Sequence, residues 1–400
     1  TLNPIGKPVA LLNSNKQKYG WERSGDYNDK PANPWIEGSW MTKHNGKYYL
    51  QYSAPGTQFK SYCDGAYVAD QPLGPFKLAP NNPVSYKPEG FIAGAGHSST
   101  FQDKYGNYWH VSTMTISQKH MFERRLGLFP AFFDKDGEFH VYTGFGDFPM
   151  KVPVSKINNP ESLFPGWMLL SYHKPVTVSS QLPNHPASYA GDEDIRTYWS
   201  AKTGDKGEWL TMDLQKTCTL NAVQLDYAEN ATKLLGRKPG IFYQYLLEYS
   251  TDKKSWTTVA DKTKNKTDVP HDYIELKTPV KARYIRLTNY HVADGTFALA
   301  DLRVFGKGVG NAPKRVNDLK MERSTSDRCI VKLKWTKAPG VTGFNIRYGT
   351  SKDKLYQNYQ VIGTDGVTIR SLNANEKYYF TVDAFNGNGL TKGTNTIELN

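Results

Sequence analysis

The stretch WMTKHNGKYYLQY, residues 40–52, decides the fold of the first part of the chain. Two runs of strand-forming residues flank Asn45-Gly46, and this pair supplies the positive φ angles that a tight hairpin turn requires. The pattern returns as STFQDKYGNYWHV at 99–111 and as PAFFDKDGEFHVY at 130–142. Repeated strand-turn-strand units rich in aromatic residues predict the blades of a β-propeller.

Composition limits the classes of protein to which the 400 residues can belong. Aromatic residues reach 13% of the chain and long apolar stretches with a 3.6-residue period are missing, which favours an all-β fold. The formal net charge is +12, but Lys and Arg are scattered singly, so nucleic-acid binding is disfavoured. No apolar run approaches the roughly 18 residues of a membrane span. We therefore expect a monomer of several domains that binds neither nucleic acid nor a membrane.

The positions of the cysteines bear on disulfide bonding, and the first residues bear on what precedes this sequence. Cys63, Cys218 and Cys329 fall one in each apparent domain, so each is interpreted as a small buried hydrophobe rather than half of a disulfide. The sequence opens on Thr1, without Met or a signal peptide, in what reads as a strand and turn. We expect an N-terminal portion of the protein to precede it.

A single carboxylate, Glu37, stands between two tryptophans in NPWIEGSW, residues 33–40. Burial of a carboxyl group among apolar rings favours its protonated form, which a general acid needs to protonate a sugar leaving group. Glu22 and Glu89 are weaker candidates for this role. An exposed glutamate at a strand end is the plain alternative for Glu37.

A second unusual string, GAGHSS at 94–99, sets one histidine among small residues that allow close backbone approach. Three further strings occur in the same region as NPWIEGSW and GAGHSS: YCDG at 62–65, LGPF at 73–76 and RRLGLFP at 124–130. In this order the strings resemble family 43 of the glycoside hydrolases, five-bladed β-propellers that invert configuration at arabinose or xylose. The resemblance covers residues 1 to about 165.

The resemblance implies roles for individual residues. Glu37 corresponds to the general acid, and His97 to a histidine in the central channel near a bound Ca²⁺. Arg124 or Arg125 matches an arginine that reaches the sugar pocket, with Arg124 preferred from its spacing to Pro130. Trp40 and Tyr62 are candidates for stacking on a sugar ring, although both residues fit a blade core equally well.

The same resemblance implies a general-base aspartate and a second aspartate that tunes the acid, both upstream of Thr1. An inverting glycosidase needs an acid and a carboxylate about 6.5–9.5 Å apart, so that a water fits on the far face of the sugar. Glu37 alone does not meet this requirement. We predict that residues 1–400 by themselves are hydrolytically inactive unless the missing blades are supplied.

Residues 175–307 contain a different set of sequence motifs. The strings ASYAGDED at 187–194, EWLTMDL at 208–214 and ADLRVFG at 300–306 resemble the discoidin, or coagulation-factor type C, domain, the jelly-roll fold of carbohydrate-binding family 32. This resemblance implies a structural Ca²⁺ held by oxygen ligands. The candidate ligands are Asp192, Asp194 and Asp301, and the candidate sugar contacts are Tyr189, His291 and Phe297.

Residues 312–400 alternate between apolar and polar side chains, as at 331–335 and 344–348. With Tyr378 at a tyrosine-corner position, this region resembles a fibronectin type III sandwich and is expected to act as a spacer or docking module. The predicted architecture is therefore a partial propeller (1–170), a discoidin-type sandwich (175–307) and a fibronectin type III sandwich (312–400), with short linkers between the units.

The combined prediction is a secreted, periplasmic or cell-surface bacterial enzyme. It would cleave α-L-arabinofuranosyl or β-D-xylosyl linkages in plant polysaccharide by inversion, with a polysaccharide or oligosaccharide as its partner. A non-catalytic carbohydrate-binding or adhesion protein, in which the propeller part is only a scaffold, is the alternative.

Overall fold

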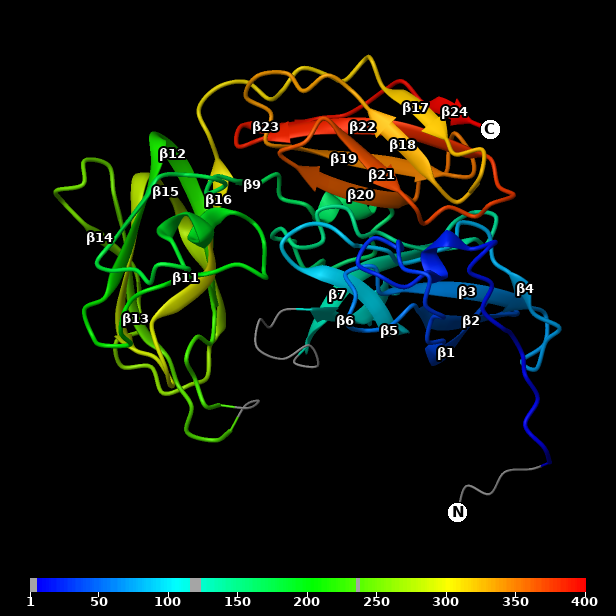
Figure 1. Ribbon diagram of the computed structural model, residues 1–400, viewed down its shortest axis with the longest axis horizontal. Coiled ribbons are helices and arrows are strands. Elements are labelled where there is room, and N and C mark those ends of the chain that lie inside the picture. Colours follow the sequence, from blue (N-terminus) through cyan, green and yellow to red (C-terminus); the bar gives the residue numbers. More distant parts are fainter. Residues whose placement is uncertain (1–5, 116–123, 235–237) are drawn as a thin grey trace.

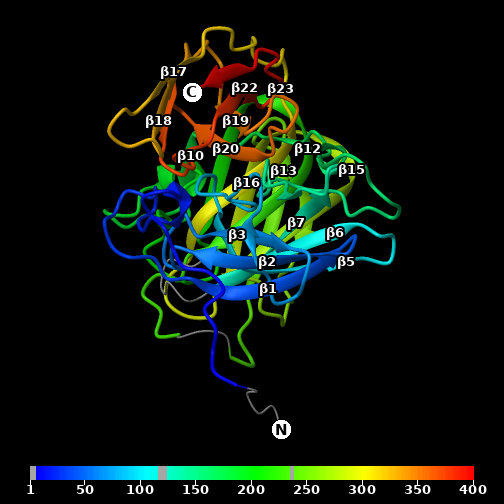
Figure 2. The same ribbon diagram turned by 90° about the vertical axis from the view of Figure 1, so that its right-hand side faces the viewer.

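The computed structural model describes residues 6–115, 124–234 and 238–400, and within these ranges the protein is built of antiparallel sheets with three short 3-10 helices. The predicted all-β class is confirmed. Figures 1 and 2 show three units, with the third lying over the first and the second beside it. Among the described residues, no helix is long and apolar enough to cross a membrane.

The first unit consists of two four-stranded sheets that pack face to face, with β5 lying against β1, β2 and β3. The Asn45-Gly46 turn has φ angles of 47° and 80°, as the sequence predicts. One sheet contains β1 (Glu37–His44), β2 (Lys47–Ala54), β3 (Cys63–Ala69) and β4 (Lys77–Leu78). The other contains β5 (Ala93–Gln102), β6 (Tyr108–Thr115), β7 (Arg124–Phe133) and β8 (Phe139–Val141). The helix η1 (Gly20–Glu22) precedes the sheets and η2 (Pro160–Leu163) follows them.

The second unit is an eight-stranded sheet in the order β11-β16-β12-β15-β13-β14, in which β10 also pairs with β12 and β9 with β16. Register shifts within β12 let this long strand bend, so that the sheet closes over a core that includes Trp199 and Leu225. Its elements are β9 (Met168–Leu169), β10 (Val176–Val178), η3 (Ala187–Gly191), β11 (Trp199–Ser200), β12 (Trp209–Tyr227), β13 (Gln244–Ser250), β14 (Thr257–Asp261), β15 (His271–His291) and β16 (Ala298–Lys307).

The third unit is a sandwich of the sheets β17-β18-β21 and β20-β19-β22-β23, with β24 paired to β22. The hydroxyl oxygen of Tyr378 accepts a hydrogen bond from the backbone N–H of Asn373 at 3.0 Å, which is the expected tyrosine corner. Its strands are β17 (Lys320–Arg323), β18 (Val331–Lys334), β19 (Gly343–Gly349), β20 (Gln357–Ile362), β21 (Gly366–Ile369), β22 (Tyr378–Asn386), β23 (Gly389–Thr391) and β24 (Ile397–Leu399).

The third unit is docked on the first rather than held apart as a spacer. Trp21 is fully buried and belongs to the same apolar cluster as the core of the third unit. Its indole N–H donates to Asn373 Oδ1 at 3.0 Å, and Arg23 pairs with Asp327 at 2.6 Å. Of the two roles that the sequence left open, spacer or docking module, the contacts are those of a docking module, because the apolar surface of the third unit covers the aromatic side chains before the first sheet.

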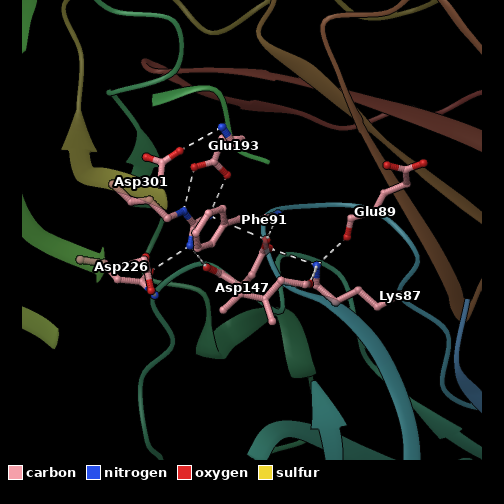
Figure 3. A network of polar contacts seen from close by, with 10 residues as sticks. Lys87, Glu89, Phe91, Asp147, Glu193, Asp226 and Asp301 are labelled. Carbon is pink, nitrogen blue, oxygen red and sulfur yellow. Dashed lines mark hydrogen bonds and ion pairs between the residues drawn. The ribbon is translucent and has the colours of Figure 1, made fainter. Parts of the chain in front are cut away.

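A buried arginine joins the second unit to the first (Figure 3). Arg303 of β16 is fully buried, and its Nε and Nη2 donate to the two carboxylate oxygens of Glu193 at 2.8 and 2.9 Å. Its Nη1 donates to the backbone oxygen of Asp147, in the first unit, at 2.6 Å. The Asp147 carboxylate lies 3.4 Å from Lys87 Nζ and accepts from the backbone N–H of Phe91.

Further acidic groups surround Arg303. Asp301 accepts from the backbone N–H of Glu193 at 3.0 Å, while its other carboxylate oxygen has no hydrogen-bond partner among the described residues. Burial and the neighbouring Glu193 raise the pKa of Asp301 well above its usual range. The guanidinium group is thus the positive charge that makes this concentration of buried carboxyl groups tolerable.

Replacing Arg303 by Met keeps most of the side-chain volume but leaves Glu193 without its cation and the backbone oxygen of Asp147 without its donor. Removal of one partner from a buried ion pair costs about 3–5 kcal/mol of unfolding free energy. We expect thermal or chemical denaturation of the full chain to show a loss of this size. The matched control is Arg283→Met, since Arg283 makes a similar two-bond contact to Asp213 but is part-exposed, and its loss should cost less than about 1 kcal/mol. Equal losses in the two variants would contradict the structural role given to Arg303.

Candidate functional site

Glu37 is the first residue of β1, where the backbone can leave the regular ladder. It pairs with Ser53 of β2, and the register shifts between Glu37 and Trp40. Gly38 adopts φ +60°, which favours glycine. The hydroxyl of Tyr62 donates to Glu37 Oε1 at 2.7 Å. Glu37 is half-buried, so its carboxyl group is held by a fixed donor and still meets solvent.

His97 of β5 completes a group of three side chains. Its Nδ1 lies 3.3 Å from the same Tyr62 hydroxyl, and its ring is exposed. A Cβ on Gly38 would come within 3.0–3.1 Å of His97 atoms, and one on Gly96 within 2.8 Å of the Tyr62 ring. Both glycines are therefore required for the close approach of the acid, the tyrosine and the histidine, which explains the small residues in the two sequence strings.

A buried polar chain lies beneath this group. The backbone N–H of His97 donates to Ser53 Oγ at 2.6 Å, and Ser53 Oγ donates to Asp64 Oδ1 at 2.5 Å. Asp64 Oδ2 lies 3.4 Å from His110 Nε2, and both side chains are fully buried. Burial raises the pKa of Asp64, against the opposing effect of His110. This series of hydrogen bonds fixes the backbone at His97, whose φ is 51°.

Sequence reasoning missed part of this arrangement. Asp64 belongs to the YCDG string that carries the family resemblance, but only Tyr62 of that string was assigned a role. His110 reads as an ordinary strand residue because its partner is distant in sequence. Asp64 lies on β3 and His110 on β6, which belong to different sheets, so no pattern along either strand could have found the pair.

The tryptophans do not enclose Glu37 as predicted. Trp35 is 70% exposed and Trp40 is 41% exposed. Trp40 donates from its indole N–H to the backbone oxygen of Thr100 at 3.0 Å, so the ring spans the two sheets. Trp35 lies before the first strand, where no element covers it. The aromatic side chain that contacts the acid is Tyr62, which lies in the loop between β2 and β3.

The alternative glutamates are held by structural contacts. Glu22 is fully buried, and it accepts from the Tyr52 hydroxyl at 2.7 Å. Glu89 lies where the three units meet, 3.4 Å from the Tyr359 hydroxyl. Burial raises the pKa of Glu89 to about 7, with Lys60 and Lys87 opposing the shift. A raised pKa alone would select these residues, whereas the geometry around His97 selects Glu37.

Arg124 and Arg125 are the first described residues after position 115. They open β7, where Arg124 pairs with Thr115 and Arg125 with Met114. Both side chains are half-buried. Because β6 lies between β7 and β5, the two arginines stand on a strand that is not adjacent to the one carrying His97. The preference for Arg124 stays a prediction.

A cleft of about 340 Å³ opens beside the acid. Glu37 is the one carboxylate among its lining residues, which are Leu11, Leu12, Ile36, Glu37, Gly38, Ser39, Leu50 and Tyr52. The arrangement supplies a proton donor or acceptor at Glu37 with a polar neighbour at Tyr62. Among the described residues that line the cleft there is no second carboxylate to activate water.

The three aspartates predicted to hold calcium in the second unit do not converge. Asp192 accepts from the Thr197 hydroxyl at 2.7 Å and from the backbone N–H of Asp194 at 3.1 Å. The Asp194 carboxylate faces the first unit, 3.9 Å from Lys60 Nζ, and Asp301 belongs to the Arg303 network. The donor set does not fit a shared ion, because Asp192 is bonded within its own loop, Asp194 faces Lys60 of the first unit, and Asp301 lies beside Glu193 in the Arg303 network.

One group of three acids does converge within the described ranges, namely Asp134, Asp136 and Glu138, whose ligand atoms all lie within 4.8 Å of one another. Lys354 of the third unit places its Nζ at 2.9, 2.7 and 2.8 Å from these carboxylates. The ammonium group stands where a metal ion would.

The predicted sugar contacts of the second unit are scattered. Phe297 is fully buried and packs edge-on against Trp199, so it cannot contact a ligand and that prediction is wrong. Strand β16 begins at the next residue, and the ring of Phe297 points into the core. His291 stacks on Phe242 with ring centroids 4.2 Å apart, and Tyr189 is half-buried in η3.

Replacing Tyr62 by Phe removes one hydroxyl and keeps the ring. We expect the fold to survive with a loss of about 0.5–1.5 kcal/mol, because one hydrogen bond to Glu37 disappears. The His97 Nδ1 resonance in nitrogen-detected NMR should shift in the same variant. Tyr67→Phe, on β3 of the same sheet, is the control, and a His97 resonance that moves equally in both variants would contradict the contact.

Comparison with known families assigns the three units. Family models match residues 9–139 to glycosyl hydrolases family 43, residues 175–301 to the F5/8 type C domain and residues 311–399 to the fibronectin type III domain. The curated β-D-galactofuranosidase xynD of Aspergillus niger is 33% identical over 87 residues, which are 22% of this chain and 25% of that protein. The chain thus spans about a quarter of the length of this relative.

Solved structures are similar over parts of the chain. A glycoside hydrolase with 18% identity covers 69% of this chain and 61% of its own, at a TM-score of 0.36. A chitosan-binding module of a Paenibacillus sp. IK-5 chitosanase/glucanase is 25% identical and covers 35% and 99%, at a TM-score of 0.29. The family 32 module of Clostridium perfringens NanJ, solved with galactose, is 20% identical and covers 35% and 98%, also at 0.29. TM-scores this low carry no weight for function.

The order of the family matches agrees with the order of units in the structure. The first match contains Glu37, Tyr62 and His97, and the other two contain the units that dock on it. The chain therefore carries, in this order, a glycosyl hydrolase family 43 domain, an F5/8 type C domain and a fibronectin type III domain.

Proposed function

We propose that this chain supplies the general acid of an inverting glycoside hydrolase, with Glu37 as the proton donor. The observation that carries the proposal is the contact of one Tyr62 hydroxyl with both Glu37 and His97, within the family 43 domain. A half-buried carboxyl group held by a fixed donor can give its proton to a glycosidic oxygen without reorganisation.

The reaction needs a second carboxylate. In inversion, a base removes a proton from water while that water attacks the anomeric carbon, and the acid protonates the departing oxygen. Asp64 is fully buried and bonded to Ser53 and His110, so it cannot hold the attacking water. We place the base on a segment outside residues 1–400, and these residues alone are then hydrolytically inactive.

The substrate class follows from the family and not from the geometry. We propose α-L-arabinofuranosyl or β-D-xylosyl side chains of plant polysaccharide, with the F5/8 type C domain binding the polysaccharide. The matched relative is named for β-D-galactofuranose, which adds a furanoside to the set to be tested. Action on such polymers favours a secreted, periplasmic or cell-surface location in bacteria, and the protein is proposed to be a monomer.

The test uses a protein that extends upstream of residue 1, with Glu37→Gln as the variant. A general acid matters most when the leaving group is poor, so turnover of an arabinoxylan oligosaccharide should fall about 10²–10⁴-fold. Turnover of a dinitrophenyl arabinofuranoside, xyloside or galactofuranoside should fall much less, because that leaving group needs no proton.

The matched control is Glu89→Gln, which alters a carboxyl group with a raised pKa outside the proposed site. Its kcat should stay within a few-fold on both kinds of substrate. An equal loss on good and poor leaving groups in Glu37→Gln, or unchanged turnover, would remove Glu37 as the acid.

Non-catalytic carbohydrate binding is the second candidate. It is favoured by the cleft beside Glu37, which contains one carboxylate. Activity in the upstream-extended protein separates the two functions, because a scaffold would bind polysaccharide without releasing sugar in any form of the chain.

A calcium ion near His97 is a further proposal that rests on the family resemblance. Tyr62 occupies Nδ1 of His97, so Nε2 is the ring atom left for a metal-bound water. Calcium at 100 times its Kd would stabilise the fold by about 2.7 kcal/mol, seen as a melting temperature that falls on chelation with EDTA and returns with Ca²⁺. The shift should shrink in His97→Gln but not in His185→Gln, and no shift in the wild type would reject the site.

A further inference from the structure

A second cleft, of about 310 Å³, lies on the seam between the family 43 domain and the fibronectin type III domain. None of its lining residues lines the cleft beside Glu37. It is bounded by β7 and the residues after β8, by the segment around η2, and by residues on β19 and at the start of β20. The lining residues are Phe132, Phe133, Asp134, His140, Tyr142, Asn158, Asn159, Pro160, Glu161, Arg347, Leu355, Tyr356 and Asn358.

Aromatic rings from both domains form one wall. Phe132 and His140 stack with centroids 5.6 Å apart, and His140 stacks on Tyr356 at 3.7 Å with the planes 5° apart. Burial lowers the pKa of His140 to about 4, so this ring is neutral at physiological pH. Phe132 and Tyr356 are half-buried, so part of each ring stays exposed. Stacking on His140 fixes the orientation of both rings.

The segment around η2 adds polar groups to the lining. Asn159 uses its Oδ1 to accept from the backbone N–H of Glu161 at 3.0 Å, which leaves its amide N–H groups for another partner. Asn158 is exposed, and no hydrogen bond of its side chain is recorded in the described structure. Planar amides and carboxylates around an aromatic wall are the groups that bind sugar hydroxyls and the apolar face of a sugar ring.

Every cation at the cleft is paired with an acid. Arg347 makes two bonds of 2.8 Å to Asp383, and Lys392 pairs with Glu161. Lys354 is shared by Asp134 and its neighbours Asp136 and Glu138, so the acids outnumber the cations on this side. This disfavours an anionic ligand, and the cleft offers hydrogen bonds and apolar contact to a neutral one.

We propose that this cleft binds a neutral oligosaccharide, at a site that exists only when the fibronectin type III domain is docked on the family 43 domain. The volume lies at the lower end of the range for small-molecule sites, which suits one or two sugar residues. The site would hold a polysaccharide away from the reaction centre. It gives the third domain a binding role in addition to its packing role, and it stands independently of any hydrolysis at Glu37.

The test measures binding by the full chain, with xylohexaose, arabinohexaose and a neutral galacto-oligosaccharide as probes. Hydrogen–deuterium exchange with saturating probe should slow in the segments 130–142, 156–162 and 354–360. Phe132→Ala should weaken the affinity at this site about tenfold, which corresponds to the loss of one stacking contact of about 1.4 kcal/mol. Asn158→Ala should weaken it several-fold, and because Asn158 is exposed this variant keeps the test valid if Phe132→Ala fails to fold.

The matched control is Phe101→Ala, which removes a part-exposed phenylalanine from β5 of the same sheet but outside the cleft. Its affinity should equal that of the wild type. The proposal is overturned if no probe slows exchange in these segments, if both cleft variants bind as the wild type does, or if only an acidic probe such as trigalacturonate binds there. Because the readout is binding and not turnover, failure here leaves the role of Glu37 untouched, and failure at Glu37 leaves this site untouched.

Discussion

The guanidinium group of Arg303 is the contact on which the arrangement of the first two domains depends. It is fully buried, with Glu193 of its own domain on one side and the backbone oxygen of Asp147 of the neighbouring domain on the other. A charge in such a place is tolerated only while all its partners are present, so the domains cannot separate without exposing or stranding it. The glycoside hydrolase part thereby gains a fixed neighbour.

Protein cations satisfy two clusters of acidic groups at the seams between domains. Lys354 reaches from the fibronectin type III domain to Asp134, Asp136 and Glu138. Arg303 binds Glu193 within its own domain and reaches the backbone oxygen of Asp147 in the next. Acidic clusters therefore lie where the domains dock, and the long side chains of Lys and Arg can reach across these seams.

The candidate acid is distinguished by its neighbours and not by burial. Burial raises the pKa values of Glu22 and Glu89, yet each of these residues is tied into a contact between domains or with the core. Glu37 sits at a strand start where glycine permits a positive φ, and Tyr62 bridges it to His97. A functional carboxyl group must meet both solvent and a fixed partner, and Glu37 combines the two.

The sequence by itself determined the elements and the identity of the three domains, because hairpin turns such as Asn45-Gly46, alternating strands and the tyrosine corner at Tyr378 are local patterns. It also singled out Glu37, Tyr62 and His97, since glycine-flanked strings are visible along the chain. Only the tertiary structure decided that Trp35 is exposed, that Asp64 meets His110, and that Asp194 faces Lys60 instead of Asp301. These outcomes depend on which surfaces meet after folding. Contacts between residues tens to hundreds of positions apart leave no periodic signal in a single sequence.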